Sequence, residues 1–168
     1  TAFALQRKVI DLADQNDWPL EKVMALNTSG LTWWTLGDHE RALRELEDAL
    51  SLARTLRIRR DEVATSLNNI GLVYREMGEF KKGLKALEEA LAIDREIKSK
   101  WAIAYDLKNI ALTYLEMEKP EKAAILFEEA LATASEIGNK INEAKILVGM
   151  GDALASTGRD AEANTAFQ

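Results

Sequence analysis

The sequence predicts an all-α fold, a right-handed α-solenoid of antiparallel helix pairs. Three observations predict it: a long internal repeat, apolar residues at helical spacing within each copy, and few residues that break helices. The 168 residues include only 2 Pro and 9 Gly, and 47% of them are hydrophobic. The strict alternation of apolar and polar residues that indicates strands does not occur. Because one helix pair cannot bury its apolar face alone, we expect successive pairs to stack.

The repeat has a period of 40 to 41 residues. The segment that begins at Gly78 (GEFKKGL) matches the one that begins at Glu118 (EKPEKAA), a shift of 40. The segment at Gly37 precedes Gly78 by 41, and the segment at Gly158 follows Glu118 by 40. Four copies in one register identify a repeat protein.

Each copy holds two apolar stripes with helical spacing and a short polar turn between them. Gly78 suits the left-handed conformation that ends a helix, and Pro120 suits the first turn of the next helix. The predicted helices cover residues 2–15, 19–36, 39–57, 61–77, 80–97, 101–117, 120–137, 141–157 and 161–168. We expect one array over residues 1–168, made of the second helix of a truncated repeat (1–15), full repeats (19–57, 61–97, 101–137) and a last truncated repeat (141–168).

Small residues recur at one point of each helix, where a large side chain would push crossing helices apart. In the first helix of each pair they are Gly30, Gly71, Ala111 and Gly151. In the second helix they are Ala42, Gly83, Ala123 and Ala163. Aromatic residues follow the first small site by three positions and are predicted to belong to the core: Trp33, Tyr74 and Tyr114.

This pattern resembles the tetratricopeptide repeat family. The family's order of small, aromatic, Gly, small, large apolar and Ala residues occurs as Gly71, Tyr74, Gly78, Gly83, Leu87 and Ala90, and again in the other copies. The period exceeds the family's usual value of about 34 residues. It is similar to that of kinesin light chains, of Leu-Gly-Asn-repeat scaffolds and of bacterial signalling regulators. The resemblance implies a superhelix whose first helices line a concave groove for a protein or peptide ligand.

The residues expected to contact that ligand lie on the first helices. They are Asn27, Leu31, Trp34, Asn68, Asn69, Leu72, Arg75, Lys108, Asn109, Leu112, Leu115 and Lys145. An Asn side chain both donates and accepts hydrogen bonds, which suits a peptide main chain. In the resembling proteins, Asn at the position of Asn69 and Asn109 holds the main chain of the ligand. The row of leucines favours an amphipathic or hydrophobic segment over a carboxylate-terminated one.

Each of these sets has an alternative interpretation. The amides can cross-link neighbouring helices, the leucines can pack against adjacent first helices, and the charged residues can be solvated. A further cluster, Arg54, Arg57, Arg59 and Arg60, lies at a helix end. Cations there complement the helix dipole, so we predict a solvated structural role, with an anion site as the alternative.

Composition argues against several other functions. The chain has no Cys and 1 His, which excludes disulfides, thiolate metal sites and a Cys nucleophile. It also has no Gly-rich phosphate loop, so we predict no enzyme activity, no catalytic residue, no metal and no cofactor. The net charge of −6 argues against nucleic acid as a partner. No apolar run approaches the ~18 residues of a membrane span, so no membrane partner and a cytoplasmic location are expected.

The sequence therefore predicts a protein–protein interaction module that binds an extended or amphipathic peptide segment. The alternative is a structural or regulatory array. Such an array would self-associate through its terminal helices or pack against other domains of a larger signalling protein.

Overall fold

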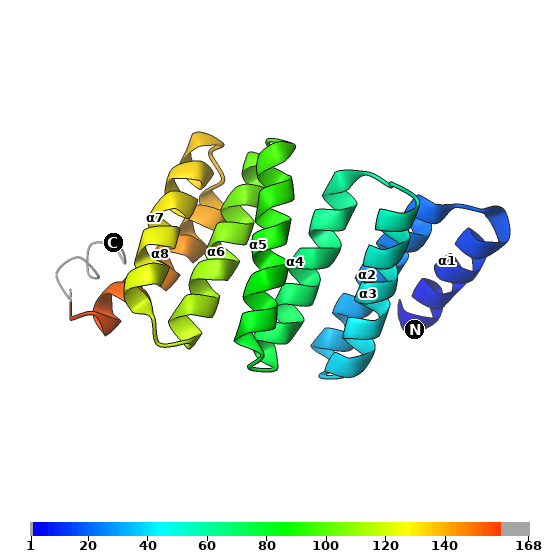
Figure 1. Ribbon diagram of the computed structural model, residues 1–168, viewed down its shortest axis with the longest axis horizontal. Helices are drawn as coiled ribbons and strands as arrows, with labels where there is room; N and C mark the ends of the chain where they lie inside the picture. The colour runs from blue at the N-terminus through cyan, green and yellow to red at the C-terminus, as the bar shows by residue number, and fades with distance from the viewer. Residues whose placement is uncertain (1, 159–168) are drawn as a thin grey trace. The chain divides into compact units, whose positions relative to one another are not determined.

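The computed structural model describes residues 2–158, with side chains from residue 4 onward, and that part contains eight α-helices and no strand (Figure 1). The helices are α1 (Ala2–Asn16), α2 (Pro19–Thr35), α3 (His39–Thr55), α4 (Arg60–Glu76), α5 (Phe80–Glu96), α6 (Lys100–Glu116), α7 (Pro120–Glu136) and α8 (Lys140–Ser156). The all-α prediction is confirmed, and every predicted end of these helices lies within two residues of the observed one. The predicted helix at 161–168 lies outside the described residues.

The chain divides into two compact units, Thr1–Ile93 and Asp94–Gln168, and the boundary falls inside α5. In the first unit, α1 packs on α2, α2 on α3 and α3 on α4, and α2 also contacts α4. In the second unit, α6 packs on α7 and α7 on α8, and α6 also contacts α8. Within each unit, first helices therefore lie beside first helices, as the repeat predicts. The expectation of a single array over residues 1–168 remains a prediction.

The second helices carry the same apolar stripe in both units. In α3 the stripe is fully buried and consists of Ala42, Leu46, Ala49 and Ala53. In α7 the corresponding stripe, also fully buried, consists of Ala123, Phe127, Ala130 and Ala134. The two stripes are 81 residues apart, or two repeat periods, so the register read from the sequence is also the register of packing.

The small residues allow close helix crossings. A Cβ atom added to Gly30 of α2 would lie 2.6 Å from Cγ of Leu46 in α3. Ala111 occupies the matching position of α6, and Phe127 stands in place of leucine on α7. The Phe127 ring approaches α8, where a Cβ on Gly149 would lie 2.5 Å from Cζ of that ring. The larger side chain of the third repeat is thus accommodated by a glycine in the next first helix.

Every described helix is followed, within two residues of its end, by a residue with positive φ. Half of these residues are glycines: Gly37, Gly78, Gly138 and Gly158. The others are Asp17, Arg57, Lys98 and Glu118, with φ between 49° and 60°. In the turn after α4, Gly78 N–H donates to Arg75 O at 2.9 Å and Glu79 N–H donates to Tyr74 O at 2.9 Å. This is the Schellman arrangement, which satisfies the last carbonyls of a helix and reverses the chain.

Each full repeat joins its two helices through an aromatic ring beneath a cation. The cation to ring-centroid distances are 4.6 Å for Arg41 over Trp33, 5.4 Å for Lys82 over Tyr74 and 5.5 Å for Lys122 over Tyr114. Trp33 and Tyr74 also pack against the core of the first unit, while their polar ends reach carboxylates. Burial, assisted by the nearby Glu47 carboxylate, raises the pKa of Tyr74 above its ordinary value. The aromatic positions therefore link the core of a repeat to its surface.

Candidate functional site

The predicted contact residues lie on the first helices of both units. We call them the first-helix face. In the first unit it consists, on α2 and α4, of Asn27, Leu31, Trp34, Asn68, Asn69, Leu72 and Arg75. In the second unit it consists, on α6 and α8, of Lys108, Asn109, Leu112, Leu115 and Lys145. Since α2 contacts α4 and α6 contacts α8, each unit brings its own part of this face together.

The C-terminal end of α2 is tied to α4 through an indole. Trp34 Nε1–H donates a hydrogen bond to Oε2 of Glu76, and Nε2 of His39 lies 4.0 Å from Oε1 of the same carboxylate. Trp34 remains partly exposed, as does Leu31 one turn before it. The carboxylate therefore fixes the orientation of the ring while leaving part of it open to contact.

The leucine row is exposed in some repeats and buried in another. Leu31, Leu112 and Leu115 are partly exposed, whereas Leu72 of α4 is only 5% exposed. For Leu72, the burial agrees with the alternative interpretation of these leucines as packing residues. For the other three, apolar surface remains available on the first helices.

The amide track is buried. The exposed fractions are 5% for Asn27, 5% for Asn68, 8% for Asn69 and 3% for Asn109. Both side-chain amide atoms of Asn27, and Nδ2 of Asn69, have no hydrogen-bond partner among the described residues. A buried polar group without a partner costs about 1–3 kcal/mol. Because these atoms are inaccessible, a ligand can reach them only after the side chain changes its rotamer.

The charged residues of the face differ in their surroundings. Lys108 is 8% exposed, and its Nζ lies 4.2 Å from the centroid of the Tyr105 ring. Tyr105 in turn stacks on Trp101, with ring centroids 5.6 Å apart and an interplanar angle of 6°. Lys145 is exposed and Arg75 is partly buried. For Lys108, the interpretation as a solvated charge is therefore wrong, because its ammonium group sits on an aromatic ring.

The stack of Trp101 on Tyr105 was not part of the predicted site. Its signal in the sequence is the spacing of four residues, which brings two side chains together on one side of a helix. Trp101 is 59% exposed, so the outer surface of the stack is accessible.

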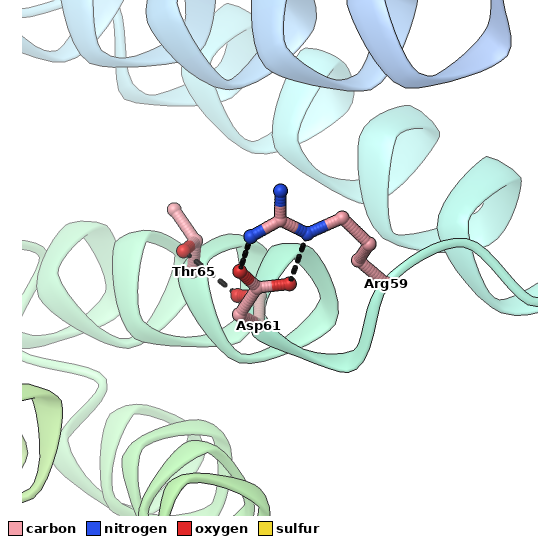
Figure 2. A network of polar contacts seen from close by, with 3 residues as sticks. All are labelled: Arg59, Asp61 and Thr65. Atoms are coloured by element: carbon pink, nitrogen blue, oxygen red, sulfur yellow. Dashed lines mark hydrogen bonds and ion pairs between the residues drawn. The ribbon is translucent and has the colours of Figure 1, made fainter. Parts of the chain in front are cut away.

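Two arginines of the cluster between α3 and α4, Arg54 and Arg59, contact carboxylates. Figure 2 shows the Arg59 guanidinium in a two-point contact with Asp61, with Nε to Oδ1 at 3.1 Å and a second contact from Nη2 to Oδ2. Thr65, one turn further along, donates from Oγ1 to Asp61 O at 2.9 Å. The hydrogen bond from Arg59 lowers the pKa of Asp61 below its ordinary value. Arg54 likewise pairs with Glu89, so both arginines serve structural ion pairs.

Within residues 2–158, no cluster of three or more His, Asp or Glu side chains is arranged to hold a metal ion. In the same part of the chain, no helix combines the length and the apolar character needed to cross a membrane.

The chain is similar in sequence and in fold to known repeat proteins. The tetratricopeptide repeat family matches residues 21–96 and 101–168. The structure of BtubC (BKLC) from P. vanneervenii is similar, with 17% identity and a TM-score of 0.87 over 97% of this chain and 68% of that one. A putative kinesin light chain from Podosopora anserina is 15% identical, with a TM-score of 0.75 over 98% and 82% of the two chains.

A Rap protein, solved in complex with competence and sporulation factor, is 18% identical with a TM-score of 0.81. The match covers 97% of this chain but 50% of the Rap protein. No curated protein matches by sequence. The fold resemblance agrees with the family match, which covers most of the sequence. The chain therefore belongs to the tetratricopeptide repeat family, whose repeats serve as protein–protein interaction modules.

Proposed function

We propose that this chain binds an extended or amphipathic peptide segment of a protein partner on the first-helix face. The observation that carries the proposal is that Leu31 and Trp34 of the first unit, and Leu112 and Leu115 of the second, remain partly exposed on first helices. Apolar surface gathered on one kind of helix marks a surface that a partner covers. Each unit offers such a surface by itself.

The polar residues of the face would orient the ligand. An extended peptide presents unpaired N–H and C=O groups, which an amide can satisfy in both senses. Asn69 would take this role after a change of rotamer, because its buried Nδ2 has no hydrogen-bond partner among the described residues. Lys145 is exposed and would attract an acidic side chain of the ligand. The polar contacts would thus set register, while the apolar contacts supply most of the affinity.

The family and one of its structural relatives support a binding role. The Rap protein was solved in complex with competence and sporulation factor, so this fold forms a binding scaffold in that protein. At 18% identity the likeness extends to the fold alone, so the identity of the ligand has to come from experiment.

A peptide-display library tests the proposal. The wild-type chain should recover a shared motif rich in apolar residues, and a Leu31→Ser/Leu112→Ser variant should lose it. The matched control is Ile125→Ser, which changes an apolar residue that is 66% exposed on the second helix α7. Equal recovery of the motif by the double variant and the wild type would refute the proposed surface.

A second variant separates the amides from the leucines. Asn69→Ala/Asn109→Ala should weaken binding while the recovered motif stays recognisable, because main-chain contacts carry little sequence information. Circular dichroism and thermal melting of each variant confirm that loss of binding is not loss of folding.

A further inference from the structure

Helix α1 exposes an apolar stripe. Leu5, Val9 and Leu12 are 67%, 46% and 41% exposed. Their spacing of four and then three residues places them on one side of the helix. Ile10 and Ala13, on the side that faces α2, are buried instead. Helix α1 therefore has two apolar sides, of which only the one that faces α2 is covered.

The repeat register shows what normally covers this stripe. The left-handed residue that ends α1, Asp17, corresponds to Arg57 at the end of α3, a shift of 40. The same shift pairs Val9 with Ala49, which is fully buried. In α3 this face packs on α2, the first helix of its own repeat. The same shift pairs Leu5 with Glu45 and Leu12 with Leu52, which are partly exposed. The centre of the stripe, Val9, thus has the position of a surface that receives another helix.

A shallow, mostly apolar hollow lies beside the stripe. It is lined by Leu5, Gln6, Val9, Glu21, Met24, Ala25 and Thr28 of α1 and α2. Met24 is 50% exposed at its floor. Gln6 Nε2 donates to Thr32 Oγ1 at 2.8 Å, which ties the two helices together, but Gln6 Oε1 has no partner among the described residues.

The charges on the rims make this surface complementary to itself. Lys8, beyond the stripe from α2, and Glu21, in the first turn of α2, are both exposed. Neither makes an ion pair within the described part of the chain. A two-fold axis places each residue of one copy against the partner patch of the other, so a cation on one rim and an anion on the other pair twice.

We propose that this surface binds a second copy of the chain. The two α1 helices lie antiparallel, each packed against the hollow between α1 and α2 of the other copy. The four helices form a small bundle with Val9 at its centre. Lys8 of one copy faces Glu21 of the other. The hollow is lined by α1 and α2 alone, so the dimer leaves the α4 part of the proposed peptide surface open.

Analytical ultracentrifugation of the 168-residue chain over a concentration series tests this proposal. The wild type should pass from monomer to dimer as concentration rises. Val9→Glu should weaken the dimer at least tenfold, because it places a carboxylate at the centre of the interface. The matched control Ile125→Glu, an exposed apolar position of α7, should leave the dimer unchanged. A monomer at every concentration, or a dimer equally strong in Val9→Glu, would overturn the proposal.

A charge exchange tests the arrangement without touching the apolar residues. Lys8→Glu and Glu21→Lys should each weaken the dimer several-fold, and the double variant should regain most of the loss. A double variant no better than the two single variants would overturn the pairing of α1 with α1. The peptide library read with Val9→Glu keeps the two proposals apart, since that change should abolish the dimer and leave the recovered motif intact.

Discussion

Helices α1 and α3 occupy the same place in the repeat but have different surroundings. The α3 stripe is fully buried under α2, while the corresponding Val9 of α1 is 46% exposed. Where α3 has Leu46, α1 has Gln6, one repeat earlier by a shift of 40. At the next equivalent position both helices have a buried alanine, Ala13 in α1 and Ala53 in α3. The repeat thus specifies which face of a helix is apolar, whereas the neighbouring helix decides whether that face is buried.

The largest expected effect comes from the position that Leu46 and Gln6 share. Leu46 is fully buried, so Leu46→Ala should lower the free energy of unfolding by about 2–5 kcal/mol. Gln6→Ala removes one hydrogen bond to Thr32 and should cost no more than about 1.5 kcal/mol. Urea unfolding followed by circular dichroism measures both, provided that the slope with urea is unchanged. Equal losses would show that α1 is as tightly covered as α3.

The next effect compares the two sides of α2. A Cβ on Gly30 would lie 2.6 Å from Cγ of Leu46 and 3.2 Å from the carbonyl oxygen of Ala42. Gly30→Ala therefore overpacks the contact with α3, at about 1–3 kcal/mol. The gain in helix propensity of about 1 kcal/mol offsets part of this cost. A net loss of up to about 2 kcal/mol is expected in the same urea assay.

The matched change on the other side of α2 is Thr28→Ala. Thr28 lines the hollow beside α1 and is exposed, and its hydroxyl donates only to Met24 O in the same helix. This variant should be neutral or slightly stabilising, because alanine is the better helix former. A loss as large as that of Gly30→Ala would mean that the α1 side is packed as closely as the α3 side.

The same distinction explains which parts of the molecule the sequence could predict. Helix ends were predictable to within two residues because Gly37, Gly78 and Pro120 mark them locally. The register was predictable because close crossings require small residues. The burial of Leu72 and Asn69 was not predictable, because it depends on neighbouring helices. The position of a residue within the repeat shows only which side of its own helix it occupies. For the same reason the leucines of the first-helix face, equivalent in sequence, differ in exposure.

A smaller effect concerns the turns after α1 and α3. Asp17 and Arg57 end these helices with φ of 55° and 49°. For a side chain other than glycine or Asn/Asp this conformation costs about 1–2 kcal/mol. Arg57→Gly should therefore stabilise the chain by up to about 1 kcal/mol after the larger chain entropy of unfolded glycine is deducted. Asp17→Gly should gain less, because Asp tolerates the left-handed conformation.

Thermal melting measures these two turns, and their comparison is informative whatever covers α1. Because a turn of this kind is stabilised by its own main-chain hydrogen bonds, the gain should follow residue type and not the packing of the preceding helix. A larger gain for Asp17→Gly than for Arg57→Gly would contradict this independence.

The smallest effect is the pH dependence of the turn between α3 and α4. The hydrogen bond from Arg59 holds the pKa of Asp61 below its unfolded value of 3.8. A carboxyl group with a lowered folded pKa contributes stability above its unfolded pKa, and that contribution disappears as the pH falls through the lower folded pKa. Asp61→Asn should thus be less stable than the wild type at about pH 6, and this difference should shrink toward about pH 2.

The effect is small because the two side chains are 66% and 40% exposed, so water and salt screen the pair. The pH dependence also distinguishes the turn after α3 from the turn after α1. The turn between α1 and α2 has no matching pair at Asp17, and an Asp17→Asn variant therefore serves as the control. If the wild type and Asp61→Asn respond identically to acid and to added salt, the charge of Asp61 adds nothing to stability, through Arg59 or through the dipole of α4.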